Sequence, residues 1–324
     1  MKARPKIIVT RRLPPAVEAA LRDQFDVTLS ASDAPTTAES LQRALAQCDG
    51  LLSTVTDRLT ADVLAAYPIR TRVIANFGVG YDNIDLVAAQ AHDITVTNTP
   101  EVLTECTADL AMTLILNVMR RAGEGEREVR SAQWTGWRPT HMMGQMVTGK
   151  TLGLVGMGRI ARAVARRAHA GFGMNILCYD PTPPSPVELA AFSAEPRSTL
   201  DELLAESDVV SLHCPSTPAT RGLLNAQRLA RMKPGAFLIN TARGDIVDDG
   251  ALIDALRSGH LAGAGLDVYR GEPNIDPRYR ALENVVLLPH LGSATRETRD
   301  AMGFRALDNL RAFFDGRPVP DRVA

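Results

Sequence analysis

Two glycines in the middle of the chain carry the clearest chemical pattern. They stand as Gly156-x-Gly158-x-x-Ala161, after the apolar run TLGLV and before the helix-favouring run RIARAVARRAHA. A glycine pattern between a strand and a helix is typical of a dinucleotide-binding turn. Gly156 allows the tight turn, Gly158 lets backbone N–H groups approach a pyrophosphate, and the start of the helix adds a favourable partial charge. Ala161 suits the third position, where a small residue lets the helix pack on the strand.

Asp180 ends the next predicted strand, NILCYD, at about the distance from Gly156 that is expected of an acid that binds ribose hydroxyls. Its charge would repel a 2′-phosphate, so the sequence favours NAD(H). NADP(H) is not excluded, because an arginine from elsewhere in the fold can offset that repulsion. The alternative interpretation is a glycine turn with an unrelated surface aspartate. The combination of strand, turn, helix and acid favours the cofactor site.

Arg243 and His290 each follow a predicted strand, AFLIN and NVVLLP respectively. Both are therefore expected at the carboxyl edge of a parallel sheet, where open α/β folds bind ligands. A guanidinium can hold a carboxylate through two hydrogen bonds, and an imidazole can donate a proton near neutral pH. The alternatives are a surface arginine paired with Asp245 and a structural histidine. His213 competes with His290, since it also ends a strand, but it lies in no motif that contains a partner acid.

The first hundred residues alternate short β-branched runs with amphipathic segments, which predicts a parallel sheet flanked by helices. The predicted strands are IIVT at 7–10, DVTLS, GLLST, RVIANFG and ITVTN, and the predicted helices are PAVEAALRDQF, AESLQRALAQ, ADVLAAY and IDLVAAQAH. At Thr99-Pro100 the alternation stops. This pair predicts the N-cap and first turn of a long helix that reaches Arg121, with a hinge at its start.

A second series begins at Lys150 and contains six predicted strands, which indicates a doubly wound sheet. These strands are TLGLVG, NILCYD, DVVSLHC, AFLINT, AGAGLDV and NVVLLPH. The segment ATRETRDAMGFRALDNLRAFFDG predicts a closing helix that ends at Gly316, before Pro318. A length of 324 residues is more than one hydrophobic core usually needs, so two domains are expected.

The composition excludes several classes of partner. With 36 basic and 37 acidic residues, the net charge of -1 creates no field that attracts nucleic acid or an anionic membrane. The sequence shows no signal-peptide pattern and no apolar run long enough to span a membrane, which predicts a cytoplasmic protein. The 4 cysteines have no paired spacing, which predicts reduced thiols, and no Cys-x-x-Cys or His-Glu-x-x-His pattern indicates a metal site.

Several longer segments resemble the D-isomer-specific 2-hydroxyacid dehydrogenase family over nearly the whole chain. They are NFGVGYDNIDL, NTPEVLTECTADLAM, NTARGDIVDDGALIDALRSGHLAGAGLDVY, GEP and LLPHLGSAT. VGYDNID and GSATRETRDAM are most similar to its glyoxylate/hydroxypyruvate reductase branch. The resemblance implies two Rossmann-like or flavodoxin-like parallel-sheet α/β domains. The cofactor domain, 100–289, is inserted into a substrate domain made of 1–99 and 290–324.

The resemblance also implies a catalytic set of Arg243, Glu272 and His290. Arg243 would hold the substrate carboxylate and polarise its ketone, and His290 would protonate the carbonyl oxygen as hydride reaches the carbon. Glu272 would accept a hydrogen bond from the other imidazole nitrogen and favour the imidazolium. Related formate dehydrogenases need no proton donor and lack this acid, so Glu272 favours carbonyl reduction. The alternative is that Glu272 is an exposed loop residue.

Further positions carry over from the same resemblance. Backbone N–H groups at Val79 and Gly80 resemble a second carboxylate clamp, and Asp267 resembles the acid that holds the nicotinamide carboxamide. Trp137, more than Trp134, resembles a tryptophan that reaches the neighbouring subunit's site in some reductases of this branch; the alternative is that both are core residues. The residues that match cofactor-lining positions are Thr104, Gly156, Gly158, Arg159, Ile160, Asp180, Cys214, Pro215, Thr220, Thr241, Ala242, Asp267 and Gly292.

Together these features predict a reductase that uses NAD(P)H on a small 2-keto acid, glyoxylate or hydroxypyruvate. A homodimer is implied by the resemblance and supported by the apolar helix at 102–119, which can also be read as an interior helix. Phosphoglycerate dehydrogenase or another 2-hydroxyacid dehydrogenase is the alternative enzyme. The alternative from another class is a cofactor-sensing protein-binding module, as in family-like transcriptional corepressors. Those proteins carry partner-recognition tails, which are not expected after the closing helix here.

Overall fold

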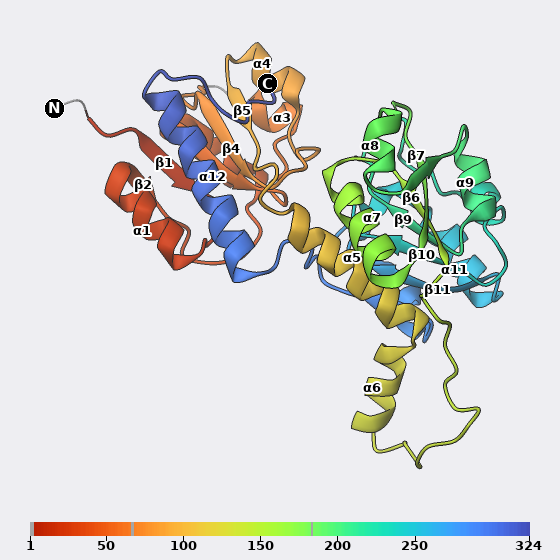
Figure 1. The fold of residues 1–324 in the computed structure, drawn as a ribbon. Coiled ribbons are helices and arrows are strands. Elements are labelled where there is room, and N and C mark those ends of the chain that lie inside the picture. Colours follow the sequence, from red (N-terminus) through yellow and green to blue (C-terminus); the bar gives the residue numbers. More distant parts are fainter. Residues whose placement is uncertain (1–2, 66–67, 183) are drawn as a thin grey trace. The chain divides into compact units, whose positions relative to one another are not determined.

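The computed structural model describes residues 3–65, 68–182 and 184–324, which fold as two compact units (Figure 1). Unit 1 consists of Met1–Leu103 together with Ala294–Ala324, and unit 2 is the inserted segment Thr104–Ser293. The domain limits expected from the sequence differ from these by a few residues at each end. The difference matters for one residue, because His290 lies in unit 2 and not with the C-terminal segment.

Unit 1 is built on a parallel sheet of five strands in the order β2-β1-β3-β4-β5. The strands are β1 (Lys6–Val9), β2 (Asp26–Thr28), β3 (Gly50–Thr54), β4 (Val73–Phe77) and β5 (Thr95–Thr97). The helices between them are α1 (Pro15–Gln24), α2 (Ala38–Gln47), α3 (Ala61–Leu64) and α4 (Leu86–Ala91). All five predicted strands are present. Their buried apolar residues, such as Ile7, Leu51 and Ile74, are fully inaccessible and form the core of the unit.

The closing helix α12 (Arg296–Phe314) belongs to unit 1, as the prediction of a substrate domain built from both ends requires. The Thr295 side chain caps its start by accepting from the Thr298 N–H, and Gly316, with a φ of 68°, follows its end. Beyond this helix the chain returns to β5. The N–H of Val323 donates to the carbonyl oxygen of Val96, and the N–H of Val96 donates to that of Ala324.

Unit 2 is built on a parallel sheet of seven strands in the order β12-β11-β10-β9-β6-β7-β8. The strands are β6 (Thr151–Val155), β7 (Asn175–Tyr179), β8 (Ala194–Pro196), β9 (Val209–Leu212), β10 (Ala236–Asn240), β11 (Leu261–Leu266) and β12 (Val285–Leu287). The chain order reverses between β6 and β9, which is the switch point of a doubly wound sheet. The predicted series of six strands omitted β8. Its sequence, AEP, has no β-branched residue, and its proline is tolerated because β8 is an edge strand.

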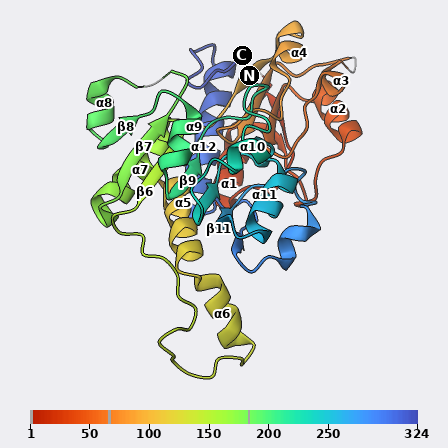
Figure 2. The ribbon, with the colours of Figure 1, turned by 90° about the vertical axis from the view of Figure 1, so that its right-hand side faces the viewer.

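Helices cover both faces of the sheet of unit 2, as Figures 1 and 2 show. They are α5 (Thr104–Met119), α7 (Arg159–Phe172), α8 (Pro186–Ala190), α9 (Leu200–Glu206), α10 (Ala226–Leu229) and α11 (Asp249–Arg257). Helix α6 (Ala122–Arg130) has no buried residue and projects from the sheet. Side chains of α5 and α7 share one apolar core with the strands, and side chains of α9, α10 and α11 share the other. Two short 3-10 helices, η1 (Gly244–Ile246) and η2 (Pro277–Ala281), lie in the loops after β10 and β11.

Helix α5 corrects one prediction and resolves another. It begins at Thr104, so Thr99 and Pro100 are not its N-cap and first turn. The N–H of Thr99 instead donates to the carbonyl oxygen of Gly78, and Glu101 has a φ of 72°, which no helix can contain. The helix is apolar because it is interior. Among its buried residues are Ala108, Leu114 and Ile115, which belong to the core of unit 2. Over the described ranges, no helix combines the length and the apolarity that crossing a bilayer requires.

Candidate active site

The turn between β6 and α7 requires glycine at its first position. Gly156 has a φ of 88°, and a Cβ atom there would lie 2.9 Å from the amide nitrogen of Cys214. Both the backbone conformation and the contact with the loop after β9 therefore exclude larger residues. The predicted tight turn is present at the carboxyl end of β6, an interior strand of the sheet of unit 2.

At position 158, by contrast, no contact among the described residues requires a glycine. Its φ of -72° suits any residue, and a Cβ atom there would meet no atom within 4 Å. Gly158 is the N-cap of α7, and the first N–H groups of any α-helix have no acceptor within that helix. The missing side chain leaves room directly at a helix N-terminus. This arrangement fits the pyrophosphate of a dinucleotide, which gains from close approach to those N–H groups.

Asp180 lies beside this turn, just after β7. Its Oδ2 atom accepts a hydrogen bond of 2.8 Å from the N–H of Met157, and its Oδ1 atom accepts one of 2.9 Å from the N–H of Thr182. Each carboxylate oxygen keeps a second lone pair that can accept from a ribose hydroxyl. The aspartate is thus hydrogen-bonded to the glycine turn, which favours a role beside that turn, and its binding of ribose hydroxyls stays a prediction.

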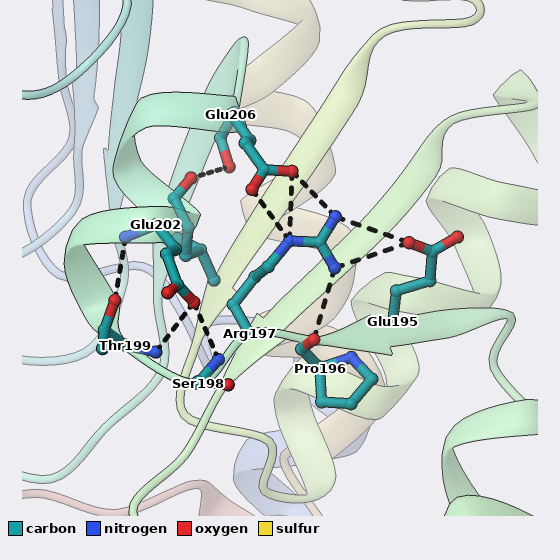
Figure 3. A network of polar contacts seen from close by, with 9 residues as sticks. Glu195, Pro196, Arg197, Ser198, Thr199, Glu202 and Glu206 are labelled. Atoms are coloured by element: carbon teal, nitrogen blue, oxygen red, sulfur yellow. Dashed lines mark hydrogen bonds and ion pairs between the residues drawn. The ribbon is translucent and has the colours of Figure 1, made fainter.

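The arginine on the neighbouring strand is already neutralised. Arg197 follows β8, and its N–H donates to the carbonyl oxygen of Cys178 on β7. Its guanidinium forms ion pairs with Glu206 at 2.8 Å and with Glu195 at 3.4 Å, and it also donates to the carbonyl oxygen of Pro196 (Figure 3). Two carboxylates therefore compete with any phosphate for this guanidinium. Arg197 is poorly suited to offset the repulsion between Asp180 and a 2′-phosphate.

Other residues that were predicted to line the cofactor lie where strands of unit 2 end. Cys214 and Pro215 follow β9, and Thr241 and Ala242 follow β10. The Thr220 hydroxyl donates to the carbonyl oxygen of Pro215 at 2.6 Å. The Thr241 hydroxyl is buried and has no hydrogen-bonding partner among the described residues. A buried hydroxyl without a partner is costly, so Thr241 is suited to bind a ligand. Thr104 begins α5 in the same unit.

Glu272 and His290 meet as the sequence predicted. The Nδ1 atom of His290 lies 2.8 Å from Oε2 of Glu272, and Oε1 of Glu272 accepts from the N–H of Tyr269 at 2.7 Å. Burial raises the pKa of Glu272, but the hydrogen bond and charge of His290, the Tyr269 N–H and the charge of Arg243 outweigh it. The net effect lowers the pKa below its ordinary value. Glu272 is thus a carboxylate at neutral pH and fixes one imidazole nitrogen, so it is not merely an exposed loop residue.

Asp267 holds the backbone on which His290 stands. The N–H of His290 donates to the Asp267 carbonyl oxygen at 2.9 Å, that of Leu291 to Oδ1 at 2.6 Å, and that of Gly292 to Oδ2 at 2.8 Å. Burial raises the pKa of Asp267 above its ordinary value, against the effect of these amides and of the charge of His290. The sequence predicts a cofactor contact for Asp267 and does not predict this role. No spacing rule indicates it, because three successive N–H groups bind one distant aspartate.

Arg243 follows β10 on a loop that is packed tightly against the Glu272 loop. A Cβ atom at Gly244 would lie only 1.9 Å from the carbonyl carbon of Tyr269, so glycine lets the two loops touch. The Arg243 Nη1 atom donates to the Ala242 carbonyl oxygen, and its charge contributes to the lowered pKa of Glu272. Unit 2 therefore brings all three members of the predicted catalytic set together. Asp245, the alternative partner of Arg243, forms an ion pair with Arg221.

His213 is unsuited to donate a proton. Its Nε2 atom lies 2.9 Å from the hydroxyl of Ser211, and burial lowers the pKa of His213 to about 4. The ring is thus uncharged near neutral pH. Between the two histidines that end strands, the geometry favours His290, which has a carboxylate partner.

The remaining predicted residues lie outside this group. Val79 and Gly80 are in unit 1, on the loop after β4, so their joint action with Arg243 on one substrate stays a prediction. Trp137 and Trp134 are in unit 2, on the segment between α6 and β6, which projects from the rest of the unit (Figure 2). They are 83% and 53% exposed, so neither is a core residue.

Comparison with known proteins agrees with this geometry. A model of the NAD binding domain of D-isomer specific 2-hydroxyacid dehydrogenases matches residues 112–292. The glyoxylate reductase of Korarchaeum cryptofilum is 44% identical, over 99% of this chain and 96% of that protein. The glycerate dehydrogenase of Hyphomicrobium methylovorum is 39% identical, over 98% of this chain and 99% of that protein.

A solved structure is similar over the same extent. It is the NADPH-dependent glyoxylate/hydroxypyruvate reductase of Sinorhizobium meliloti in complex with NADP and malonate. It superposes with a TM-score of 0.87 at 35% identity and covers 99% of this chain and 97% of that one.

Proposed function

The chain belongs to the D-isomer-specific 2-hydroxyacid dehydrogenase family and is an NAD(P)-dependent oxidoreductase, and on that premise we propose that it reduces glyoxylate or hydroxypyruvate to the 2-hydroxy acid. The observation that carries the proposal is the hydrogen bond of 2.8 Å between His290 and Glu272, beside Arg243. An imidazole paired with a carboxylate is a proton donor, and carbonyl reduction needs one. The names of the similar proteins indicate the size and charge of the substrate.

Arg243 binds the carboxylate of the keto acid and orients the neighbouring carbonyl. Its planar guanidinium matches a carboxylate with two hydrogen bonds, which an ammonium group cannot do. When bound, the nicotinamide supplies the hydride that adds to the carbonyl carbon. As negative charge grows on the carbonyl oxygen, the His290 imidazolium gives up its Nε2 proton to that oxygen, and the product is the 2-hydroxy acid. Glu272 holds the ring at Nδ1 and stabilises its charged form before the transfer.

NADH is the proposed cofactor. Asp180 lies at the glycine turn, and the guanidinium of Arg197 on the neighbouring strand is held by Glu195 and Glu206. Both features disfavour a 2′-phosphate. The similar reductase of Sinorhizobium meliloti is named as NADPH-dependent, so the test below compares NADH with NADPH.

The proposed assembly is a homodimer in which Trp137 reaches the partner's substrate site. The support is the exposure of large apolar side chains on one segment, namely 83% for Trp137, 68% for Met143 and 70% for Met146. Exposed apolar groups so close in sequence are typical of a protein interface.

The test is the oxidation of NADH and of NADPH in the presence of glyoxylate, hydroxypyruvate or pyruvate. We expect turnover with NADH on at least one of the first two acids. In His290→Ala, turnover is expected to fall by about 10²–10⁴, the usual contribution of general acid–base catalysis. A wild-type enzyme that turns over neither glyoxylate nor hydroxypyruvate would overturn the proposed activity. Full turnover of His290→Ala would reject His290 as the proton donor.

A further inference from the structure

The loop after β4, residues 78–80, has an unusual division of its backbone groups. Each of its carbonyl oxygens accepts a hydrogen bond from elsewhere in unit 1. The N–H of Thr99 donates to Gly78 at 3.0 Å, and the side-chain amide of Asn98 donates to Val79 at 2.8 Å. The side-chain amide of Asn76 donates to Gly80 at 2.8 Å.

Two N–H groups of the same loop, unlike its carbonyl oxygens, are not hydrogen-bonded. Within the described part of unit 1, those of Val79 and Gly80 have no hydrogen-bond acceptor. In each peptide group the C=O of one residue and the N–H of the next residue point in opposite directions. The donors on the carbonyl oxygens of Gly78 and Val79 therefore turn the N–H groups of Val79 and Gly80 away from the body of the unit, where a ligand can reach them. The donor on the carbonyl oxygen of Gly80 fixes the next peptide group of the loop. Adjacent N–H groups of this kind form an anion-binding concavity.

The two asparagines are themselves rigidly held. Asn76 is fully buried on β4, and its Oδ1 atom lies 3.4 Å from both the Ser53 hydroxyl and the Asn83 side-chain amide. Asn98 is 7% exposed, and its carbonyl oxygen accepts from the Asn309 side chain. Buried amides with few alternative partners hold the loop in one conformation, because any other arrangement leaves a polar group unpaired.

We propose that Asn76 and Asn98 are positioning residues for the substrate carboxylate. By binding the carbonyl oxygen of Val79, Asn98 presents the N–H of Gly80 to the anion, and Asn76, by binding the carbonyl oxygen of Gly80, fixes the next peptide group and with it the end of the loop. The inference rests on the proposed function, which supplies a carboxylate substrate. It assigns these asparagines to substrate binding and not to hydride or proton transfer, because they act only through the loop.

The proposal predicts a change in substrate affinity that is separate from turnover. In Asn98→Ala and in Asn76→Ala, the KM for glyoxylate and the Kd of oxamate are expected to rise at least about 10-fold, the scale of a lost charge-assisted hydrogen bond. Oxamate keeps the carboxylate of a 2-keto acid but cannot be reduced. Its binding to the enzyme with NADH is measured directly by calorimetry. The KM for NADH is expected to stay within about twofold.

Thr71→Val is the matched control. Thr71 is 2% exposed, lies before β4, and donates through its hydroxyl to the carbonyl oxygens of Leu45 and Cys48. It thus loses the same kind of buried hydrogen bond without touching the loop, and we expect a lower Tm but an unchanged Kd of oxamate. If Asn98→Ala does not fold, Asn98→Ser, whose hydroxyl is too short to reach Val79, takes its place.

The outcomes separate the two proposals. If the wild-type enzyme is active but the asparagine variants bind oxamate with the wild-type Kd, or with a Kd that changes no more than in Thr71→Val, the positioning role is rejected. The proposed activity is unaffected by that result. If the wild-type enzyme reduces no keto acid, the proposed function itself fails.

Discussion

His290 stands on a strained backbone, with a φ of 58° that residues with side chains rarely adopt. Such a conformation costs roughly 1–2 kcal/mol and persists only where the surroundings enforce it. Here Asp267 enforces it, by accepting from three successive N–H groups. The result is an imidazole whose position depends on two carboxylates, one on the backbone and one, Glu272, on the ring.

Replacing Glu272 by glutamine tests the second of these contacts. The lowered pKa of Glu272 keeps it negative at neutral pH, so in the wild-type enzyme it favours the protonated imidazole. Glutamine removes that charge while keeping the length of the side chain, and it cannot stabilise the imidazolium as a carboxylate does. We expect the kcat for glyoxylate to fall about 10-fold or more in Glu272→Gln, while the KM for NADH stays within about twofold, as measured by steady-state kinetics.

The control for this measurement is Glu283→Gln, which removes an exposed carboxylate that pairs with Arg127. Its kcat is expected to equal that of the wild-type enzyme. An unchanged kcat in Glu272→Gln would mean that the carboxylate does not support the proton donor.

At the scale of the elements, the strand–turn–helix unit at β6 and α7 separates two uses of glycine. Gly156 is required by the fold, because its φ is 88° and the loop after β9 is in contact with it. Gly158 is not required by any described contact. We infer that the second glycine is kept free for the cofactor, and this makes folding and binding separable by mutation.

Gly158→Ala is expected to fold normally and to bind NADH more weakly. The added methyl group occupies space that the pyrophosphate needs, and we expect the Kd of NADH to rise about 10-fold or more, while Tm changes by no more than about 2 °C. Fluorescence titration and thermal unfolding measure the two quantities. Gly171→Ala, at the end of α7 and also without an atom within 4 Å, should change neither. Unchanged NADH binding in Gly158→Ala would contradict the cofactor site.

The sequence predicted elements well where local physics determines them. The strands of both sheets follow β-branched runs, and α12 follows from its capping threonine and terminal glycine. Among the features that the sequence did not predict, two depend on contacts between distant segments. Strand β8, AEP, has no strand propensity and exists because β7 offers it an edge. Helix α5 starts after Thr99 because that residue is engaged by Gly78, a contact between distant segments.

The candidate site shows the same division. The glycine turn, Asp180 and the three catalytic residues each lie in a recognisable motif, and unit 2 brings them together. The residues that support this site do not lie in a recognisable motif. Asp267 was assigned another role, and Asn76 and Asn98 were not singled out, because their partners are backbone groups whose direction the sequence does not encode.

At the scale of the whole molecule, the proposed homodimer would cover the exposed segment between α6 and β6. If a second copy covers it, light scattering will show a dimer, and Trp137→Ala will raise the KM for the keto acid several-fold without changing that for NADH. Trp134→Ala, on the same segment but less exposed, is the matched control and should change neither. A monomer, or two variants with the same kinetics, would refute the contribution of Trp137 to a partner's site.

Unit 1 contains both the beginning and the end of the described sequence, with unit 2 between them. The two segments of unit 1 are therefore synthesised at very different times. Asn98 is synthesised early, but Asn309, which binds its carbonyl oxygen, follows 211 residues later. The backbone partners of Val96, which are Val323 and Ala324, are likewise synthesised much later. Unit 2 is thus synthesised as one continuous stretch, whereas the unit that holds the Val79 loop has all of its parts only once α12 and the segment after it have been made.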